Sequence, residues 1–381
     1  MPNELNIARC VIYTIVMVPL FSTANLLLIG VSLKTVYGAS SKISCKNAMG
    51  FPVDWFVIYK LPKTKDHRNT KQLDGGEMAY YGSDSENSEW ELLPFSIYFR
   101  KSNPVKETLA PIYNEAQREV AFLAYNDQPP RGFRSRRGGH TKGLLLVGKG
   151  KNGGAVWLQH SVPRFVDDVT KEYEYPHSGR ENGQLFFCTS FPFEAVETIS
   201  LHLHIQEANV YQARAPEWAH AFRKFWLLLR KKYLRVKKAE LRVDYLRTNG
   251  RTPVIMIAKP PRLFTDVYTK DLRKRMNDSI TVQSWRNGAG GAQQKYCSIK
   301  YSVTDVETIV IRTEEEKFYF STREDHSKWY ITRTSGVFCF STLNRMLSQR
   351  KRGGEITCIK EKPLAKLFEK SINKRSNCRR K

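Results

Sequence analysis

The sequence has few acidic residues for its length. Its 381 residues include 37 Asp and Glu against 62 Lys and Arg, which leaves a formal net charge of +25. The only acidic runs are residues 167–168 and 314–316, which read as solvated surface, so a carboxylate metal centre is not indicated. A positive charge of this size attracts polyanions, which makes nucleic acid the first candidate partner and an anionic membrane surface the second.

Two further site types lack an essential part. Residues 148–154 read Gly-Lys-Gly-Lys-Asn-Gly-Gly, without the Gly-Lys-Ser/Thr ending of a phosphate-binding loop, so we predict a hairpin turn there. His202 and His204 lie on one face of a predicted strand, residues 201–205, but no third metal ligand is near them in sequence. The pattern favours ordinary strand histidines over a metal site.

The composition excludes disorder and places the N-terminus apart from the body. Hydrophobic residues make up 41% of the chain and aromatic residues 12%, which is typical of a folded globular protein. No residue from Val11 to Leu33 is charged, and small residues follow at 38–40. We therefore expect a signal peptide in residues 1–40, cleaved between Ala24 and Ser41; an uncleaved membrane anchor is the alternative.

Either reading places the body in a lumenal or extracellular compartment, where disulfides persist. Without Cys10 the chain has an even number of cysteines, whose pairing the sequence alone leaves open: Cys45, Cys188, Cys297, Cys339, Cys358 and Cys378. Asn277-Asp278-Ser279 is an acceptor triplet for N-glycosylation, which fits the same compartment.

A His-x-Lys pair occurs twice, at His140 with Lys142 and at His326 with Lys328, and strand-forming residues follow each copy. Side chains two apart in a strand project from the same face. An imidazole can attack phosphorus or donate a proton near neutral pH, and an ammonium group holds phosphate oxygens. One copy alone would mean little, but the repetition indicates a single phosphate-handling site built from both.

The second pair follows the first by roughly half of the expected mature length, which favours two similar halves. We expect an N-terminal half at residues 41–205, a C-terminal half at 206–370 and a basic tail at 371–381.

Two basic segments leave open whether they contact phosphate or are solvated. Residues 131–137 form an arginine-rich loop that leads into the first pair. Residues 217–246 have a helical spacing of apolar residues with lysines and arginines between them.

Several segments together resemble the deoxyribonuclease II family: Pro52–Pro62, Tyr125–Pro130, Gly139–Gly143, His160–Pro163, Ser190–Phe193, Glu324–Trp329 and Arg352–Gly354. The resemblance implies an α/β (α+β) fold of the phospholipase D-like kind, a pseudo-symmetric pair of sheet-and-helix halves with one active site at their interface. It also implies hydrolysis of DNA at acidic pH, with no metal ion or cofactor and little sequence specificity, leaving 3′-phosphate and 5′-hydroxyl ends. Such a protein would be secreted or lysosomal, as a monomer or homodimer.

The resemblance also implies roles for individual residues. His140 and His326 would be catalytic through a phosphohistidine, with His140 the favoured nucleophile, and Lys142 and Lys328 would stabilise charge on the phosphate. The family's superfamily carries a Ser-x-x-Asn element, which Ser341 to Asn344 fits. In the first half Ser161 to Arg164 would match it, so that Arg164 stands where an amide is expected. His160 would lie close by and complete the substrate-binding set.

The family's disulfides would map to Cys45 with Cys188 and Cys297 with Cys358. A third would join Cys339 to the position that Tyr330 occupies here. Cys339 is then free or paired elsewhere, and Cys378 is one candidate.

Three other functions compete with a nuclease. A secreted DNA-binding protein on the same scaffold, with weak or lost catalysis, is suggested by Arg164, by the missing cysteine and by the high charge. A lipid phosphodiesterase would suit the basic surface, but the quoted segments do not extend to lipid enzymes. A purely structural disulfide-rich protein would leave the duplicated pairs unexplained.

Overall fold

A computed structural model describes residues 42–99, 102–135, 138–150, 153–288 and 290–378. The expected signal peptide, and Arg136 and Arg137 of the arginine-rich loop, lie outside these ranges. Within them, no helix is long and apolar enough to cross a membrane.

The first half of the chain forms an eight-stranded sheet in which all neighbouring strands are antiparallel. The antiparallel pairing of its third and fourth strands confirms the hairpin predicted at residues 148–154. In spatial order the strands are β10 (Val210–Arg214), β6 (Ala121–Asn126), β7 (Lys142–Gly148), β8 (Gly154–His160), β9 (Gln184–Phe191), β3 (Trp55–Lys60), β4 (Met78–Gly82) and β5 (Glu91–Leu92). A separate small sheet pairs β1 (Cys45–Lys46) with β2 (Pro52–Val53).

The second half forms a nine-stranded sheet whose only parallel pair is β13 with β14. Its strands are, in order, β11 (Arg242–Arg247), β12 (Pro253–Lys259), β18 (Gly354–Ile359), β17 (Phe338–Ser341), β16 (Trp329–Thr332), β13 (Ile280–Gln283), β14 (Val303–Arg312) and β15 (Lys317–Ser321), with β19 (Ile372–Arg375) also paired to β14.

The two sheets share an internal strand order. The antiparallel run β6-β7-β8-β9-β3 in the first sheet recurs as β13-β16-β17-β18-β12 in the second. One His-x-Lys pair leads into β7 and the other into β16, which occupy the same place in the two runs. The fold is thus mixed α and β with large sheets, as predicted; its likeness to phospholipase D stays a prediction.

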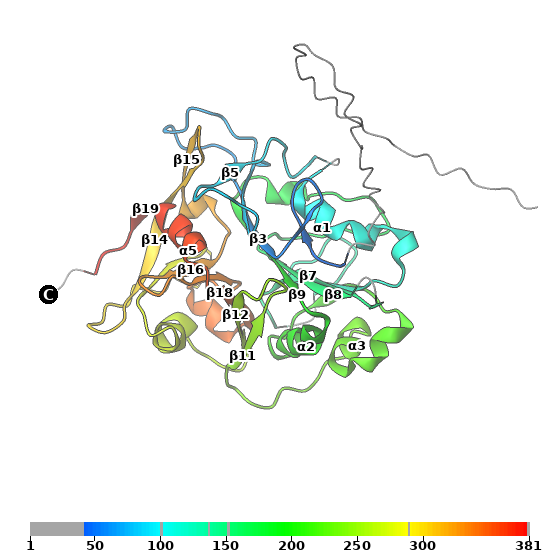
Figure 1. Cartoon of the computed structure of the whole chain (residues 1–381). Helices are drawn as coiled ribbons and strands as arrows, with labels where there is room; N and C mark the ends of the chain where they lie inside the picture. Colours follow the sequence, from blue (N-terminus) through cyan, green and yellow to red (C-terminus); the bar gives the residue numbers. More distant parts are fainter. Residues whose placement is uncertain (1–41, 100–101, 136–137, 151–152, 289, 379–381) are drawn as a thin grey trace, which may run out of the picture. The chain divides into compact units, whose positions relative to one another are not determined.

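The sheets pack against each other through a shared apolar core. Tyr59 and Phe187 from the first sheet and Trp329 and Phe340 from the second are all buried in it. These residues come from β3, β9, β16 and β17, so the two sheets face each other across this core (Figure 1).

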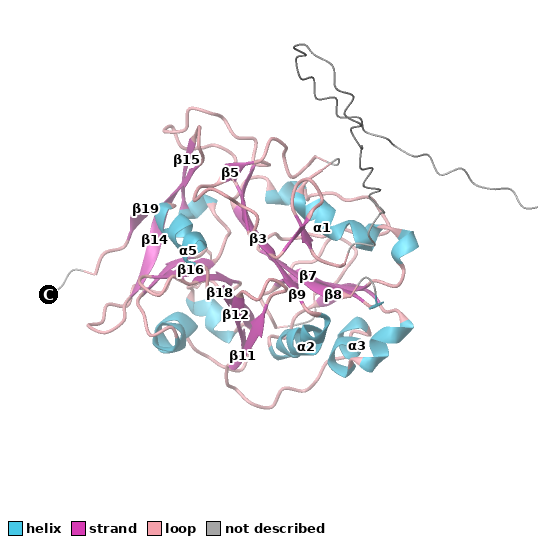
Figure 2. Ribbon diagram, viewed as in Figure 1, coloured by secondary structure: helices cyan, strands magenta, loops and turns pink. Residues whose placement is uncertain are grey.

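Helices cover the remaining faces of the sheets (Figure 2). Helix α1 buries Val105, Leu109 and Ile112 on the face of the first sheet that points away from the second. Helices α2 and α3 lie side by side over the other face of β7 and β8, and α5 packs into the core between the sheets. The helix bounds are α1 (Pro104–Tyr113), α2 (Val196–Ile205), α3 (Arg223–Leu229), α4 (Arg273–Arg275), α5 (Lys362–Lys370) and a π-helix at Tyr268–Leu272.

The predicted strand at residues 201–205 is wrong, because this segment is the second half of α2. Val196, Ile199 and Leu203 recur at helical spacing and are buried against the first sheet, a pattern that starts before the short apolar run considered above. His202 and His204 are both buried there. His202 Nε2 lies 2.7 Å from an Asp244 carboxylate oxygen, and His204 Nε2 lies 3.0 Å from the Lys224 carbonyl oxygen.

The helix predicted at residues 217–246 is mostly wrong as well. Only α3 within it is α-helical, preceded by a 3₁₀ turn at Glu217–Ala221. Lys231 adopts a positive φ of 52°, the left-handed conformation that commonly ends a helix. Residues 242–247 are instead strand β11, since they pair with β12.

Three disulfides are present, and one of the two mapped pairings is corrected. Cys45 pairs with Cys188, as the resemblance implied, but Cys297 pairs with Cys378 and Cys339 pairs with Cys358. Cys339 and Cys358 lie directly opposite each other on β17 and β18, with their Cα atoms 3.9 Å apart. Cys358 is therefore bonded to Cys339 and is not available to Cys297.

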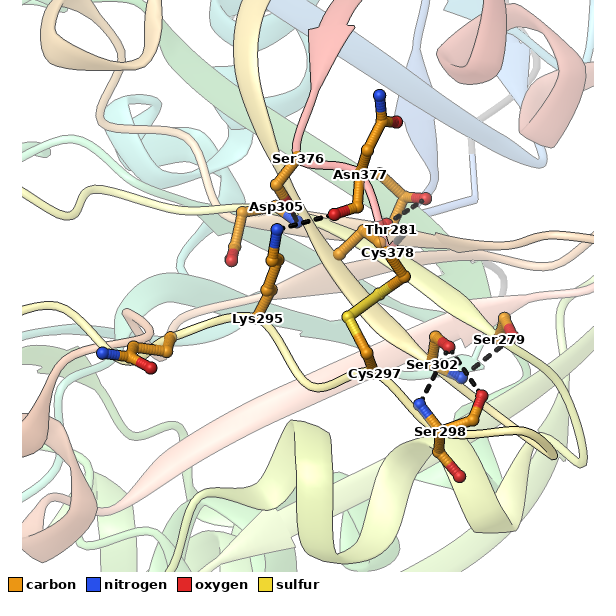
Figure 3. The surroundings of a disulfide bond; sticks show 12 residues. Ser279, Thr281, Lys295, Cys297, Ser298, Ser302, Asp305, Ser376, Asn377 and Cys378 are labelled. Atoms are coloured by element: carbon orange, nitrogen blue, oxygen red, sulfur yellow. Dashed lines mark hydrogen bonds between the residues drawn. A yellow bond between two sulfur atoms is a disulfide. The ribbon is translucent and has the colours of Figure 1, made fainter. Parts of the chain in front are cut away.

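The C-terminal tail supplies Cys378, the disulfide partner of Cys297 (Figure 3). Strand β19 pairs with β14, Ser376 N donates to the Asp305 carbonyl at 2.8 Å, and Lys295 Nζ donates to the Asn377 carbonyl at 2.6 Å. These contacts place Cys378 beside Cys297. The tail expected to be merely basic therefore anchors the loop that carries Cys297.

We expect proteolytic digestion without reduction, followed by mass spectrometry, to recover linked peptides for Cys297 with Cys378 and for Cys339 with Cys358. The same digest should contain the Cys45 to Cys188 link, which serves as the internal control because both mappings share it. A peptide joining Cys297 to Cys358 would contradict this pairing.

Candidate active site

The two histidines are held by reciprocal backbone hydrogen bonds between the halves. His140 N donates to the Gly353 carbonyl at 2.8 Å, and His326 N donates to the Gly183 carbonyl at 2.9 Å. Gly353 is required by close packing, since a Cβ there would lie 2.0 Å from the Gln206 carbonyl oxygen. Each half thus positions the other half's histidine.

Side chains from both halves line one narrow cavity. Lys142 begins β7 and Lys328 immediately precedes β16, and both lysines are buried. The cavity is lined by His140, Lys142, His160, Ser161, Lys328, Ser341 and Thr342. Most of the site residues expected from the sequence are therefore together, although they come from strands that lie far apart in the chain.

The hydrogen bonds of His140 define its tautomer. Its Nδ1 lies 2.6 Å from the Thr342 carbonyl oxygen, which can only accept, so Nδ1 carries the proton. In the neutral ring Nε2 then has a free lone pair. Burial lowers the pKa of His140 to about 3, although Asp127 partly opposes this.

Asp127 is a site residue to which the sequence analysis gave no role. One carboxylate oxygen pairs with Lys142, and the other lies 3.2 Å from Arg352 and 4.0 Å from His140 Nε2. Burial alone would raise the pKa of Asp127, but Lys142, His140 and Arg352 together hold it well below its ordinary value. Asp127 lies in the Tyr125–Pro130 segment that carried the resemblance, which was the available signal.

His326 has a different neighbour from that of His140. Its ring is perpendicular to the indole of Trp285, with the ring centroids 4.1 Å apart. Burial, together with the charges of Lys328 and Lys142, lowers the pKa of His326 to about 3. Trp285 also went unnoticed in the sequence, because it follows β13 in a loop without any motif.

The segment before His326 is held by a buried carboxylate. Asp325 accepts hydrogen bonds from the Tyr59 hydroxyl at 2.5 Å, from Ser327 Oγ at 2.7 Å and from Gln283 Nε2 at 2.7 Å. Tyr59 belongs to the first half, so this network also crosses the interface.

Lys328 completes a site with an excess of positive charge. Its ammonium group donates to the His326 carbonyl. Burial, together with the charge of Lys142, lowers the pKa of Lys328 to about 7. Lys328 is therefore an ammonium group at acidic pH and begins to lose its proton near neutrality. An anion bound between the two lysines would relieve this repulsion.

His160 is a buried histidine with one unused nitrogen. Val162 N donates to His160 Nδ1 at 3.2 Å, so the proton of the neutral ring is on Nε2. That Nε2 is buried and has no hydrogen-bond partner among the described residues. A buried donor of this kind is available to a ligand in the cavity.

The match between the two halves is shifted by one residue from the one inferred above. Leu185 N donates to Ser161 Oγ at 3.0 Å, and Glu355 N donates to Thr342 Oγ1 at 3.0 Å. Ser161 is thus equivalent to Thr342. His160 is in turn equivalent to Ser341, since β8 and β17 run in the same register beside their His-x-Lys strands.

His326, Asn344 and Arg164 are not among the residues that line the cavity, although His326 is near enough for Lys142 and His140 to lower its pKa. Asn344 is buried, and its Oδ1 has no partner within the described ranges. Arg164 is exposed, and its backbone N donates to the Gln128 carbonyl at 2.8 Å. This bond places the backbone of Arg164 beside Gln128, the residue that follows Asp127.

Two buried lysines donate hydrogen bonds to the segments that lead to Gly183 and Gly353. Lys60 Nζ donates to the carbonyls of Gly75 and Arg180, at 3.1 and 3.0 Å. At the equivalent end of β12, Lys259 Nζ donates to the carbonyls of Arg350 and Arg352, at 2.8 and 2.7 Å. Residues 180 and 350 each lie three positions before the glycine that holds a histidine. Burial lowers the pKa of Lys60 to about 7 and that of Lys259 to about 8.

We expect Lys60→Met to lower the free energy of unfolding by about 1–3 kcal/mol, because two carbonyl groups would lose their buried donor. Lys259→Met should have an effect of the same size. Denaturant unfolding monitored by tryptophan fluorescence provides the measurement. Lys63→Met is the matched control, because Lys63 is exposed and lies in the same segment. Equal stability of all three variants would show that the buried lysines are not structural supports.

Comparison with known proteins finds similar sequences that match most of the chain. The family model described as Deoxyribonuclease II matches residues 44–378. Deoxyribonuclease-2-beta of Mus musculus is 30% identical over 340 residues, covering 86% of this chain and 91% of that protein. Deoxyribonuclease-2-alpha of Mus musculus is 30% identical, covering 88% and 94%. Plancitoxin-1 of Acanthaster planci is 28% identical, covering 90% and 94%.

Proposed function

Because the chain belongs to the deoxyribonuclease II family, we propose that it is a DNA endonuclease that acts at acidic pH without a metal ion. Its products would be 3′-phosphate and 5′-hydroxyl ends. The observation that carries the proposal is that both histidines are held by reciprocal bonds between the halves, beside a single cavity lined by His140 and both lysines.

In the first step His140 Nε2 attacks the scissile phosphorus. Its lone pair is directed by the Nδ1 to Thr342 hydrogen bond, which supports His140 over His326 as the nucleophile. The N–P bond forms as the bond to the 5′-oxygen breaks, and the His326 imidazolium donates its proton to that oxygen. The intermediate is a phosphohistidine carrying the 3′-nucleotide.

In the second step water attacks the phosphohistidine. Neutral His326 takes a proton from the water as its oxygen bonds to phosphorus and the N–P bond breaks. This returns His140 and the His326 imidazolium to their starting states and releases the 3′-phosphate.

Cationic and hydrogen-bonding groups stabilise the charge that develops on the phosphate. Lys142 and Lys328 hold its non-bridging oxygens, which supplies electrostatic stabilisation that a metal ion provides in other nucleases. His160 Nε2–H donates to one of these oxygens, and Ser161 and Ser341 assist from the cavity wall.

Two residues outside the cavity lining would act nearby. Asn344 lies three residues after Ser341, and its side-chain amide would reorient toward the phosphate when DNA is bound. Arg164 is exposed beside the Asp127 loop, so it would contact a phosphate next to the scissile one. These contacts are to the backbone, which fits binding with little sequence specificity.

The requirement for acid follows from the charges of the site. His326 must be protonated for the first step, but burial and two lysines keep its pKa at about 3 in the free protein. The negative charge of a bound phosphodiester favours the imidazolium and raises that pKa. Lys328 also needs pH below about 7 to keep its charge. Both groups therefore favour activity at low pH.

The protein would work in a lysosome or outside the cell. Three disulfides suit an oxidising compartment, and the relatives named above support the same location. Asn277, in the predicted glycosylation triplet, is exposed at a turn. Its modification remains a proposal.

One of the arguments for a DNA-binding protein without catalysis no longer holds. The missing cysteine partner does not leave Cys339 unpaired, because Cys339 is joined to Cys358. Both His-x-Lys pairs are also complete, and His140, Lys142 and Lys328 line one cavity.

We expect the purified protein to cut plasmid DNA at pH ~5 in excess EDTA, since histidine chemistry operates there and metal chemistry does not. His140→Ala and His326→Ala should each lose at least ~100-fold in rate, which is the usual size of the effect of losing a general acid or base. His177→Ala is the control, because His177 is exposed and lies outside the cavity.

Two results would refute the proposal in different ways. Cleavage that stops with EDTA and returns with a divalent cation would mean a metal-dependent nuclease. Retarded migration of the plasmid without cutting by the wild type would mean a DNA-binding protein whose site does not turn over.

The pH dependence offers a second test. The basic limb of kcat, which reports the DNA complex, should lie about 1–3 pH units above that of kcat/KM, which reports the free protein. The reason is that bound phosphodiester raises the pKa of His326. Both limbs should be measured at one ionic strength, because salt weakens DNA binding. Coincident limbs would show that substrate charge does not control the acid.

A further inference from the structure

The equivalence of the two halves extends to the residues beside each histidine. In the first half Asn126 of β6 lies opposite Lys142 of β7, and Asp127 comes next. In the second half Gln283 of β13 lies opposite Trp329 of β16, so the following residue, Ser284, is in register with Lys328. Trp285 comes next and is the structural counterpart of Asp127.

These two counterparts make equivalent contacts with opposite chemistry. Asp127 places a carboxylate oxygen 4.0 Å from His140 Nε2, whereas Trp285 places an indole ring 4.1 Å, between centroids, from the ring of His326. The pseudo-symmetry of the site is therefore broken at the residue that faces each imidazole.

We propose that Trp285 is a positioning residue that holds His326 as the acid of the reaction, and that this exchange of indole for carboxylate separates the roles of the two histidines. The inference rests on the nuclease function proposed above. Two perpendicular rings place the edge of one against the face of the other, and the face of an indole attracts cations. With the edge of the His326 imidazolium on the Trp285 face, its charge would be stabilised and its ring held toward the leaving oxygen.

An indole suits this position better than a second carboxylate would. The charged groups that face His326 are Lys328 on its own strand, Lys142 and His140 from the first half, and Lys60 from β3. The adjoining Asp325 carboxylate is taken up by Tyr59, Ser327 and Gln283. A carboxylate at position 285 would bind the proton-donating imidazolium tightly and oppose transfer of its proton, whereas the weaker cation–π contact orients the ring without that cost.

The loop that carries Trp285 is anchored at both ends. Ser284 Oγ accepts a hydrogen bond from Arg345 N at 3.1 Å, directly before the tryptophan. Further along, Gln293 N donates to the Arg345 carbonyl at 2.8 Å, and the Cys297 to Cys378 disulfide ties the loop to the C-terminal tail (Figure 3). The indole is thus supported by the main body of the second half and remains half-buried at the site.

The test compares Trp285→Leu, Trp285→Phe and the control Trp218→Leu, which removes another half-buried indole, one that packs against Phe193. Each variant is assayed across pH on DNA and on the 4-nitrophenyl ester of thymidine 3′-phosphate. The nitrophenolate of that ester departs without needing a proton. Unfolding curves of all variants show whether the fold is retained.

Trp285→Leu should shift the basic limb of kcat on DNA to lower pH by about 0.5 to 1 unit and lower kcat above the optimum by roughly 3- to 10-fold. It should keep the wild-type kcat on the nitrophenyl ester. Trp285→Phe, which retains an aromatic face, should lie between Trp285→Leu and wild type, and Trp218→Leu should match wild type on both substrates.

Two outcomes would overturn the inference while leaving the nuclease intact. Equal losses on both substrates, with an unchanged pH profile, would make Trp285 a structural residue only. A raised KM on DNA with an unchanged kcat profile would make it a stacking platform for a nucleobase. Wild-type protein that cleaves neither substrate would instead refute the proposed function itself.

Discussion

The site depends on one reciprocal constraint, in which each histidine is held by a backbone carbonyl of the opposite half. The bonds from His140 to Gly353 and from His326 to Gly183 are short and equivalent. Gly353 also lies close to the Gln206 carbonyl oxygen, an approach that it permits because it has no side chain. Neither half can therefore hold its own histidine in place, and the site exists only when the two sheets are packed together.

The burial of the site lowers the pKa values of its basic groups. The packing that joins the halves also buries two lysines and partly buries two histidines, and it leaves Asp127 as the one carboxylate that directly pairs with them in the described part of the chain. Charged forms of the buried bases are then costly, which is why the pKa values of His140, His326 and Lys328 all fall. In the proposed mechanism a bound phosphodiester would offset this positive charge, so that affinity for the substrate and protonation of His326 would be coupled.

Two of the errors made from the sequence share a cause, since the disulfide pairing and the extent of the long helix both depended on contacts between distant segments. The disulfide pairing followed a template, yet Cys339 meets Cys358 because β17 pairs with β18, and Cys378 reaches Cys297 because β19 folds back on β14. The long helix predicted after residue 217 stops where Lys231 takes a positive φ and where β11 joins the second sheet. Local periodicity contains no information about either event.

The sequence by itself determined the charge of the protein, the two His-x-Lys pairs and the strands that follow them. These are local properties, since alternation along a strand and the spacing of two side chains on one face need no partner. Only the tertiary structure decided that Asp127 faces His140 while Trp285 faces His326, and that Lys60 and Lys259 support the glycine loops. Strand register sets these contacts, and register follows from how separate strands pair across the sheet.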